Sequence, residues 1–215
     1  MRNLLCLLIL LCAAADAGEP AVLVFGDSLS SGHGIDVDRS WTALLQRRLE
    51  SQGYEHRVVN ASISGETTEG GAARIDEALD RFRPELVIVE LGGNDGLRGF
   101  PPARIEQNLR AIIEKSLAAG AGVVLLGIRI PPNYGPRYTR AFENVYRELA
   151  GELGIAWIEF FMEGVASNDD LMQDDRIHPN AKGQAVLLDN AWPAIRGALP
   201  SHEDGAGNRA AGDGI

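Results

Sequence analysis

Two short motifs, far apart in the chain, hold residue types that can perform nucleophilic acyl transfer. Ser28 lies in the sequence GDSLS (residues 26–30), directly after an apolar run, where Gly26 lets the backbone turn sharply. Asp175 precedes His178 by three residues, so a single turn can bring its carboxylate to an imidazole N–H. Because a serine needs such a base to attack a carbonyl at neutral pH, we predict Ser28, Asp175 and His178 as catalytic residues.

His178 is the best placed of the four histidines. The following Pro179 favours an extended backbone at His178 and suits the first turn of a final helix. His33 is close to the serine in sequence and remains a second candidate base. His56 stands beside the start of a predicted strand, where we expect it to be solvated, and His202 lies in the C-terminal tail.

Two further loops hold candidate hydrogen-bond donors for an oxyanion. Gly65 stands just before a predicted helix, and a glycine there can bring its backbone N–H close to a ligand oxygen. Asn94, in the sequence GGNDG (residues 92–96), offers a side-chain N–H among glycines that permit close approach. All these motifs also have ordinary structural interpretations: turns in the two glycine-containing loops, a helix cap at Ser28, and the start of a helix at residues 175–178.

Apolar runs and helical periodicities alternate along the chain and must position these residues. The runs predict strands over residues 21–25, 57–61, 86–91, 123–130 and 156–160. Apolar residues at helical spacing predict helices over residues 40–51, 67–82, 103–119, 139–153 and 180–199. This alternation without a repeat indicates one α/β domain with a parallel sheet, and the common doubly wound order for five strands is 2-1-3-4-5.

In this strand order the candidate residues meet at one place. Ligands bind beyond the carboxyl ends of such strands where the order reverses, here between strands 1 and 3. Ser28 follows the middle strand, and Gly65 and Asn94 follow its two neighbours, which lie about 10 Å apart. We therefore predict an oxyanion hole with Gly65 and Asn94 beside the nucleophile. Strand 5 lies roughly 14 Å from strand 1, so residues 161–174 must carry the base back across the strand ends.

The N-terminal segment, residues 1–17, has the layout of a secretory signal peptide. A single arginine is followed by an apolar run too short to span a membrane, and then by small residues in an A-x-A pattern. Cleavage there would leave a domain over residues 18–200 and a Gly- and charge-rich tail over residues 201–215, which we expect to be disordered. We therefore expect a periplasmic or secreted protein.

Composition argues against several classes of function. Both cysteines, Cys6 and Cys12, lie inside the predicted signal peptide, so the mature chain would have neither a cysteine nucleophile nor a thiolate metal site. The net charge of −10 should repel nucleic acid and anionic lipid headgroups. No second segment of membrane length follows, which indicates no stable membrane anchor. We expect a monomer that acts on a small-molecule ester or thioester, without a metal or organic cofactor.

The four motifs together resemble the SGNH (GDSL) hydrolase family, whose catalytic Ser, Gly, Asn and His fall on Ser28, Gly65, Asn94 and His178. Residues 172–180, among others, are similar to its subgroup of bacterial multifunctional thioesterases, proteases and lysophospholipases and related arylesterases. The resemblance spans nearly the whole mature chain. It implies a flavodoxin-like three-layer α/β/α fold, a periplasmic location, and cleavage of acyl-CoA thioesters, aryl esters and lysophospholipids through an acyl-enzyme. In that mechanism the Ser28 backbone N–H joins the oxyanion hole.

Apolar residues in the loops beside the site are candidates for binding the acyl or aryl group. These candidates follow strands 3 and 4 or adjoin the base: Leu97, Phe100, Ile130, Pro131, Tyr134 and Ile177. Glycines around the first two would let that loop move over a bound chain. The same side chains could instead cap the core, since single exposed apolar residues are common.

Other functions fit parts of the pattern. A carbohydrate O-deacetylase of the same family would prefer acetyl esters over medium-chain ones. A non-enzymatic flavodoxin-like module would bind a flavin or a nucleotide and would leave Asp175, His178 and Asn94 without a role. The intact set of Ser28, Asp175 and His178 argues against a catalytically inactive binding protein.

Overall fold

Five strands form one parallel sheet in the predicted order, β2-β1-β3-β4-β5. The strands are β1 (Ala21–Gly26), β2 (Arg57–Asn60), β3 (Leu86–Glu90), β4 (Gly122–Leu126) and β5 (Ala156–Ile158). The computed structural model describes residues 19–200. The predicted signal peptide (1–17) and C-terminal tail (201–215) lie outside the described residues, as does His202.

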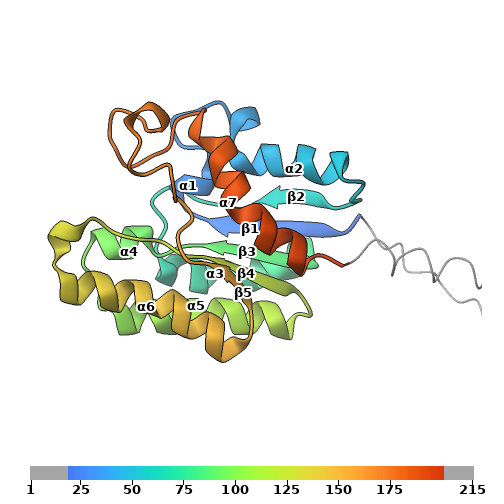
Figure 1. Ribbon diagram of the computed structural model, residues 1–215. Helices are drawn as coiled ribbons and strands as arrows, with labels where there is room; N and C mark the ends of the chain where they lie inside the picture. Colours follow the sequence, from blue (N-terminus) through green and yellow to red (C-terminus); the bar gives the residue numbers. More distant parts are fainter. Residues whose placement is uncertain (1–18, 201–215) are drawn as a thin grey trace, which may run out of the picture.

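Helices cover both faces of the sheet (Figure 1). One face carries α2 (Trp41–Ser51) and α7 (Gly183–Ala198), and the other carries α3 (Thr68–Phe82), α5 (Pro102–Ala118) and α6 (Pro136–Leu153). Two short helices, α1 (Ser28–Ser31) and α4 (Gly93–Leu97), follow β1 and β3 directly, and single 3₁₀ turns span Val37–Arg39, Pro132–Tyr134 and Asp169–Leu171. The predicted three-layer α/β/α fold class is confirmed.

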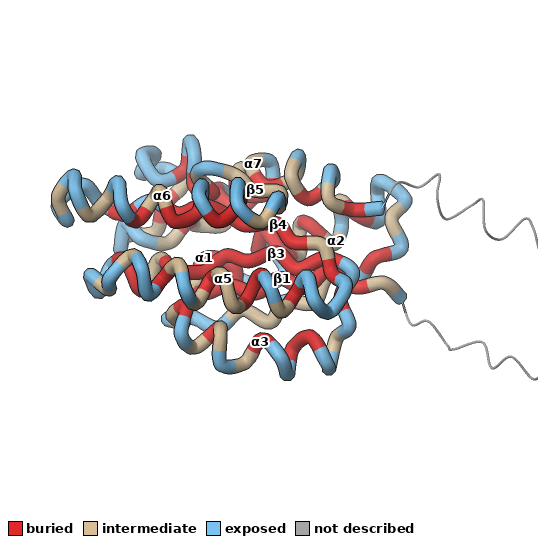
Figure 2. Tube along the Cα trace, turned by 90° about the horizontal axis from the view of Figure 1, so that it is seen from below, coloured by how far each residue is buried: buried red, intermediate tan, exposed pale blue. Residues whose placement is uncertain are grey.

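The alternation of side chains along β1 divides the core into two layers. Val22 and Val24 pack with the α2 and α7 side, whereas Leu23 and Phe25 pack with α3, α5 and α6. Buried positions follow the strands and the inward sides of the helices (Figure 2). Because a central parallel strand is covered on both faces, its sequence is a continuous apolar run rather than an alternating one.

β4 ends earlier than the sequence predicts. The apolar run continues to Ile130, but the strand ends at Leu126. A Cβ at Gly127 would lie 2.3 Å from the carbonyl oxygen of Glu159, so the backbone there passes directly against the chain that leaves β5. Ile128 and Ile130 are buried in the core beyond the end of the strand.

His56 is buried, which corrects the expectation of a solvated side chain. The residue is only 7% exposed, and its Nε2 lies 3.0 Å from a carboxylate oxygen of Glu85. Its ring also packs edge-on against Tyr54, with ring centroids 6.0 Å apart. These contacts give His56 a structural role at the start of β2.

Candidate active site

Ser28 is the first residue of α1, immediately beyond the carboxyl end of β1. Asp27 caps this helix, since its side chain accepts the N–H of Leu29 at 3.1 Å. The interpretation of Ser28 as a helix cap is therefore wrong, and its hydroxyl is available for another partner. A side chain at Gly26 would clash with its neighbours, because a Cβ there would lie 2.7 Å from a carboxylate oxygen of Glu90.

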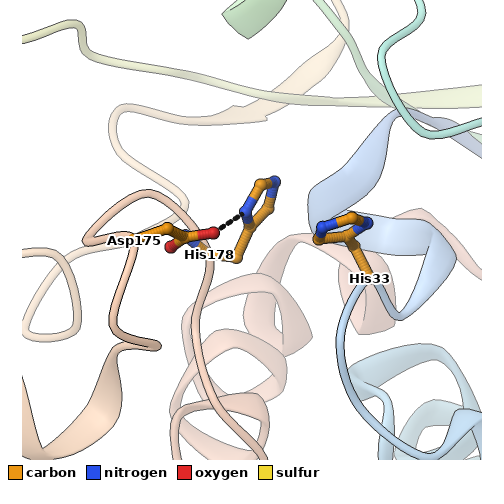
Figure 3. Close-up of side chains that lie close together, drawn as sticks. All are labelled: His33, Asp175 and His178. Carbon is orange, nitrogen blue, oxygen red and sulfur yellow. Dashed lines mark hydrogen bonds and ion pairs between the residues drawn. The ribbon is translucent and has the colours of Figure 1, made fainter.

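The serine and the Asp175-His178 pair, far apart in sequence, are joined by hydrogen bonds. Nε2 of His178 lies 2.9 Å from Oγ of Ser28. Its Nδ1 lies 2.7 Å from Oδ2 of Asp175 (Figure 3). If Nδ1–H donates to the carboxylate, the neutral imidazole has its lone pair on Nε2, the atom that faces the serine hydroxyl. This is the arrangement in which a histidine can accept the proton of a serine.

Asp175 is held in place by its own turn. Its Oδ1 accepts the backbone N–H groups of Ile177 and His178, at 2.9 and 3.0 Å. The hydrogen bond from the His178 ring, followed by these two backbone bonds, lowers the pKa of Asp175 well below its ordinary value. The carboxylate therefore stays ionised beside the imidazole throughout the neutral and mildly acidic range.

Hydrogen bonds from amide side chains bring the segment after β5 back across the strand ends. Asn190 of α7 donates to the carbonyl of Phe161 at 3.0 Å and fixes the beginning of this segment. Near its other end, Gln173 donates from its side chain to the carbonyl of His33 at 2.8 Å. The backbone N–H of Gln173 donates to the carbonyl of His178, also at 2.8 Å. Gln173 thus ties the loop that holds His178 to the loop that follows α1.

His33, the second candidate base, lies beside His178. The two ring centroids are 4.4 Å apart and the ring planes are tilted by 43° (Figure 3). The hydrogen bonds to Ser28 and Asp175 are made by the ring of His178. The geometry therefore favours His178 as the base and leaves His33 as its exposed neighbour.

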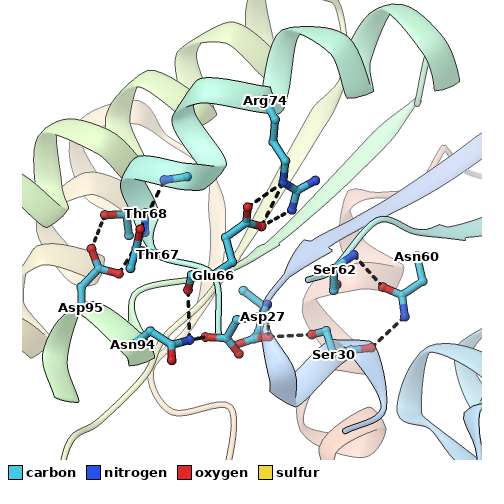
Figure 4. A network of polar contacts seen from close by, with 12 residues as sticks. Asp27, Ser30, Asn60, Ser62, Glu66, Thr67, Thr68, Arg74, Asn94 and Asp95 are labelled. Carbon is cyan, nitrogen blue, oxygen red and sulfur yellow. Dashed lines mark hydrogen bonds and ion pairs between the residues drawn. The ribbon is translucent and has the colours of Figure 1, made fainter. Parts of the chain in front are cut away.

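The short helix α4, where the sequence suggested a turn, positions Asn94. Its buried Asp95 accepts the backbone N–H and the hydroxyl of Thr68, at 2.9 and 2.6 Å, and so fastens α4 to the start of α3. The Asn94 amide donates to Oδ2 of Asp27 at 2.9 Å and to the carbonyl of Glu66 at 3.0 Å (Figure 4). Because a primary amide has two N–H groups, both donors are engaged. An oxyanion would have to compete for one of them with the neutral Glu66 carbonyl.

Gly65 lies on the exposed loop between β2 and α3. Its φ of +81° is in the left-handed region, and a Cβ there would meet no atom within 4 Å, so backbone conformation rather than crowding favours glycine. The N–H of Ile63 donates to the carbonyl of Gly26 at 3.0 Å, which ties this loop to the end of β1. The N–H of Ser28, at the first position of a helix, has no acceptor within that helix. The predicted donors thus belong to segments that are hydrogen-bonded to one another.

Two buried carboxylates lie next to Ser28, and neither was predicted as a site residue. Asp27 is 2% exposed and Glu90 is fully buried. Glu90 accepts the hydroxyl of Ser30 at 2.7 Å and the N–H of Asp27 at 3.3 Å. Burial raises the pKa of Asp27 from 3.8 to about 6, and burial together with the charge of Asp27 raises the pKa of Glu90 well above its ordinary value. In the sequence, the only indication of Glu90 as a site residue is that a lone acidic residue stands at the end of an apolar strand.

The predicted substrate-binding residues fall into two groups. Leu97, Tyr134 and Ile177 are 37%, 36% and 49% exposed, and the Tyr134 hydroxyl donates to the carbonyl of Leu97 at 2.7 Å. Pro131 is also exposed and Phe100 is half-buried against the core.

Ile130 is only 7% exposed, and its side chain packs so closely on α4 that a Cβ at Gly96 would lie 2.6 Å from it. The structure therefore supports the alternative interpretation of Ile130, as a side chain that caps the core.

A serine, a histidine and an aspartate linked in this order at the carboxyl edge of a parallel α/β sheet are the arrangement of a serine hydrolase. The family model described as "GDSL-like Lipase/Acylhydrolase family" matches residues 24–186, and the chain belongs to this family.

Known proteins share this similarity over most of the chain. The chain is 49% identical to Esterase TesA of Pseudomonas aeruginosa, over 93% of this chain and 100% of that protein. It is 46% identical to thioesterase 1/protease 1/lysophospholipase L1 of Escherichia coli K12, over 85% of this chain and 83% of that protein. The crystal structure of the psychrotrophic esterase EstA from Pseudoalteromonas sp., inhibited by monoethylphosphonate, matches with a TM-score of 0.79 at 40% identity, over 82% of this chain and 97% of that chain.

Proposed function

We propose that this enzyme hydrolyses carboxylic ester and thioester bonds of acyl or aryl substrates through an acyl-enzyme formed on Ser28. One observation carries the proposal: a single imidazole links the Ser28 hydroxyl, at 2.9 Å, to the Asp175 carboxylate, at 2.7 Å. The names of the relatives, an esterase and a thioesterase/lysophospholipase, support the same bond types.

The reaction follows from the roles of these groups. His178 accepts the Ser28 proton while Oγ attacks the carbonyl carbon, and the charge of Asp175 stabilises the imidazolium. The backbone N–H groups of Ser28 and Gly65 and the amide of Asn94 stabilise the oxyanion. His178 then returns the proton to the leaving alcohol or thiol, and water activated by the same imidazole hydrolyses the acyl-enzyme.

The proposed setting is the periplasm or the exterior of the cell, and the proposed state is a monomer. The signal-peptide pattern of residues 1–17 supports export, and the names of the relatives support an acyl hydrolase. Within the described residues 19–200, no helix combines the length and the apolar character needed to cross a bilayer.

Replacing Ser28 by alanine tests the proposal. We expect Ser28→Ala to lower turnover of p-nitrophenyl esters and acyl-CoA thioesters by about 10⁶-fold, as loss of the nucleophile does in comparable enzymes. A phosphonate probe should label the wild type and fail to label the variant. Ser31→Ala, which removes another hydroxyl from α1, is the matched control and should keep most of the activity. Turnover and labelling that survive in Ser28→Ala would exclude the proposal, and a strict preference for acetyl esters would favour the deacetylase alternative.

The exposed side chains of Leu97 and Tyr134 are proposed to contact the acyl chain. They lie together after β3 and β4, joined by the hydrogen bond from the Tyr134 hydroxyl to the Leu97 carbonyl. Leu97→Ser leaves that backbone contact in place and removes only apolar surface. We expect kcat/KM for medium-chain p-nitrophenyl esters to fall several-fold relative to the acetyl ester, since each buried methylene is worth about 0.8 kcal/mol. An unchanged chain-length profile would remove Leu97 from the acyl site.

A further inference from the structure

The neighbour of the proposed base has no part in the mechanism. His33 is exposed, and its ring lies 4.4 Å from the ring of His178, measured between centroids. Its backbone is fixed, because its carbonyl accepts a hydrogen bond from Gln173 at 2.8 Å. The imidazole therefore projects beside His178 from a backbone that is held in place (Figure 3).

Three potential metal ligands converge at this point. One ring nitrogen of His33, one of His178 and a carboxylate oxygen of Asp175 all lie within 4.8 Å of one another. Zn²⁺ binds such atoms at about 2.0–2.2 Å in tetrahedral geometry, which places neighbouring ligand atoms roughly 3.5 Å apart. To meet this requirement the His33 side chain would close by about 1 Å, whereas Nδ1 of His178 and the Asp175 carboxylate, now 2.7 Å apart, would open by a similar amount.

We propose that His33, His178 and Asp175 form a Zn²⁺ site through which the metal reversibly inhibits the hydrolase. Two imidazoles and one carboxylate favour Zn²⁺ over Mg²⁺ or Ca²⁺, which prefer oxygen ligands. Water would complete four-coordination. The net charge of −10 favours the approach of a cation.

Inhibition follows from which lone pair the metal takes, and this half of the inference rests on the proposed function. Asp175 faces Nδ1 of His178, so a metal that binds all three side chains takes the lone pair on Nδ1. The neutral imidazole then carries its proton on Nε2, and coordination to the metal replaces the hydrogen bond from Nδ1 to Asp175. Because Nε2 is protonated, it cannot accept the proton of Ser28.

The experiment measures zinc binding and zinc inhibition separately on the full-length protein. Competition with a chromogenic chelator gives the Zn²⁺ dissociation constant, and p-nitrophenyl ester turnover during a ZnCl₂ titration gives the inhibition constant. We expect one Zn²⁺ per chain, inhibition that EDTA reverses, and no inhibition by Mg²⁺. In His33→Ala and His33→Gln we expect both constants to weaken by at least tenfold, since the loss of even an outer-shell partner costs about 10–100-fold. Activity without zinc should be unchanged in both variants.

The control is Asp36→Asn, which removes a charge from the same loop but none of the three proposed ligands. It should bind zinc and be inhibited as the wild type is. Equal zinc binding by His33→Ala, by His178→Ala and by the wild type would overturn the site. Zinc binding that depends on His33 but leaves turnover unaffected would overturn the inhibition. Because the chelator measurement needs no turnover, failure of the zinc site remains distinct from failure of the proposed hydrolase function, which Ser28→Ala tests.

Discussion

Two aspartates flank Ser28 and His178, and their surroundings shift the pKa of the same chemical group in opposite directions. The side chain of Asp175 is 41% exposed, and hydrogen bonds from its own turn lower its pKa. Asp27 is 2% exposed, and burial raises its pKa to about 6 even though the N–H of Leu29 and the amide of Asn94 oppose that effect. Hydrogen bonding thus controls the exposed carboxylate, whereas desolvation dominates the buried one.

The comparison separates two tasks. A carboxylate that stays ionised is suited to holding the imidazole and stabilising its positive form, which is the role proposed for Asp175. Asp27 instead caps α1 with one oxygen and accepts the Asn94 amide with the other. The base side of the site should therefore depend mainly on charge, and the oxyanion side mainly on the orientation of donors.

Within this comparison, the largest expected effect comes from neutralising the exposed carboxylate. Asp175→Asn keeps the shape but replaces an acceptor with a donor facing Nδ1, so the imidazole adopts the wrong tautomer. We expect kcat for a p-nitrophenyl ester to fall about 10⁴-fold at pH 8, as the equivalent change does in a comparable triad. Asp174→Asn, one residue away, is the control and should behave as the wild type does. A loss below tenfold in Asp175→Asn would show that its charge is not needed.

A smaller effect is expected on the oxyanion side. Asn94→Ala removes one proposed donor, and we expect kcat to fall by about 10²–10³-fold with little change in KM. The substitution also removes a hydrogen bond that lowers the pKa of Asp27. Steady-state kinetics, with circular dichroism to check the fold, would measure the effect. A rate unchanged within error would remove Asn94 from the oxyanion hole.

The smallest effect concerns the pH dependence of stability. The pKa of Asp27 rises from 3.8 to about 6 on folding, so the folded state binds this proton more tightly than the unfolded state does. The resulting contribution of Asp27 to the free energy of unfolding is fully present below pH 3.8 and is lost as the pH rises through about 6. When the pH is lowered from 7.5 to 4, the free energy of unfolding of the wild type should therefore rise relative to that of Asp27→Asn by on the order of 3 kcal/mol.

Urea unfolding at several pH values measures this difference. The exposed Asp80→Asn variant is the control, and its stability should parallel that of the wild type at every pH. Parallel curves for Asp27→Asn and the wild type would contradict a raised pKa for Asp27.

Local patterns were sufficient to predict most of the fold. The strands of the sheet are short apolar runs, and their order follows from the preference of doubly wound sheets. The prediction failed at the end of β4, because the close approach of Gly127 to the backbone of Glu159 is a long-range contact that composition does not reveal. It also failed at His56, whose burial depends on packing against Tyr54 and pairing with Glu85.

The residues proposed to take part in the chemistry could be predicted from their types. The residues that hold them in place were harder to predict. The motifs around Ser28 and His178 could be found in sequence because their chemistry restricts them. The path of residues 161–174 could not, because it is fixed by hydrogen bonds such as the one from Gln173 to His33, 140 residues away. Sequence also shows that Asp27 adjoins the nucleophile, but not that it is buried.

The attachment of Gln173 has a consequence for chain length. Its side-chain amide fills the space over Gly34, where a Cβ would lie 2.2 Å from it, so the end of the returning segment is anchored independently of its beginning. The beginning of the segment is held at Phe161 by Asn190, and its end is held at Gln173 by His33. Between these two points in the sequence lies the exposed turn at Gly164, where a Cβ would meet nothing within 4 Å. We expect a peptide epitope grafted at that turn to lengthen the loop without displacing the imidazole, as long as Glu163 keeps its hydrogen bond to Asn190 and Val165 stays buried.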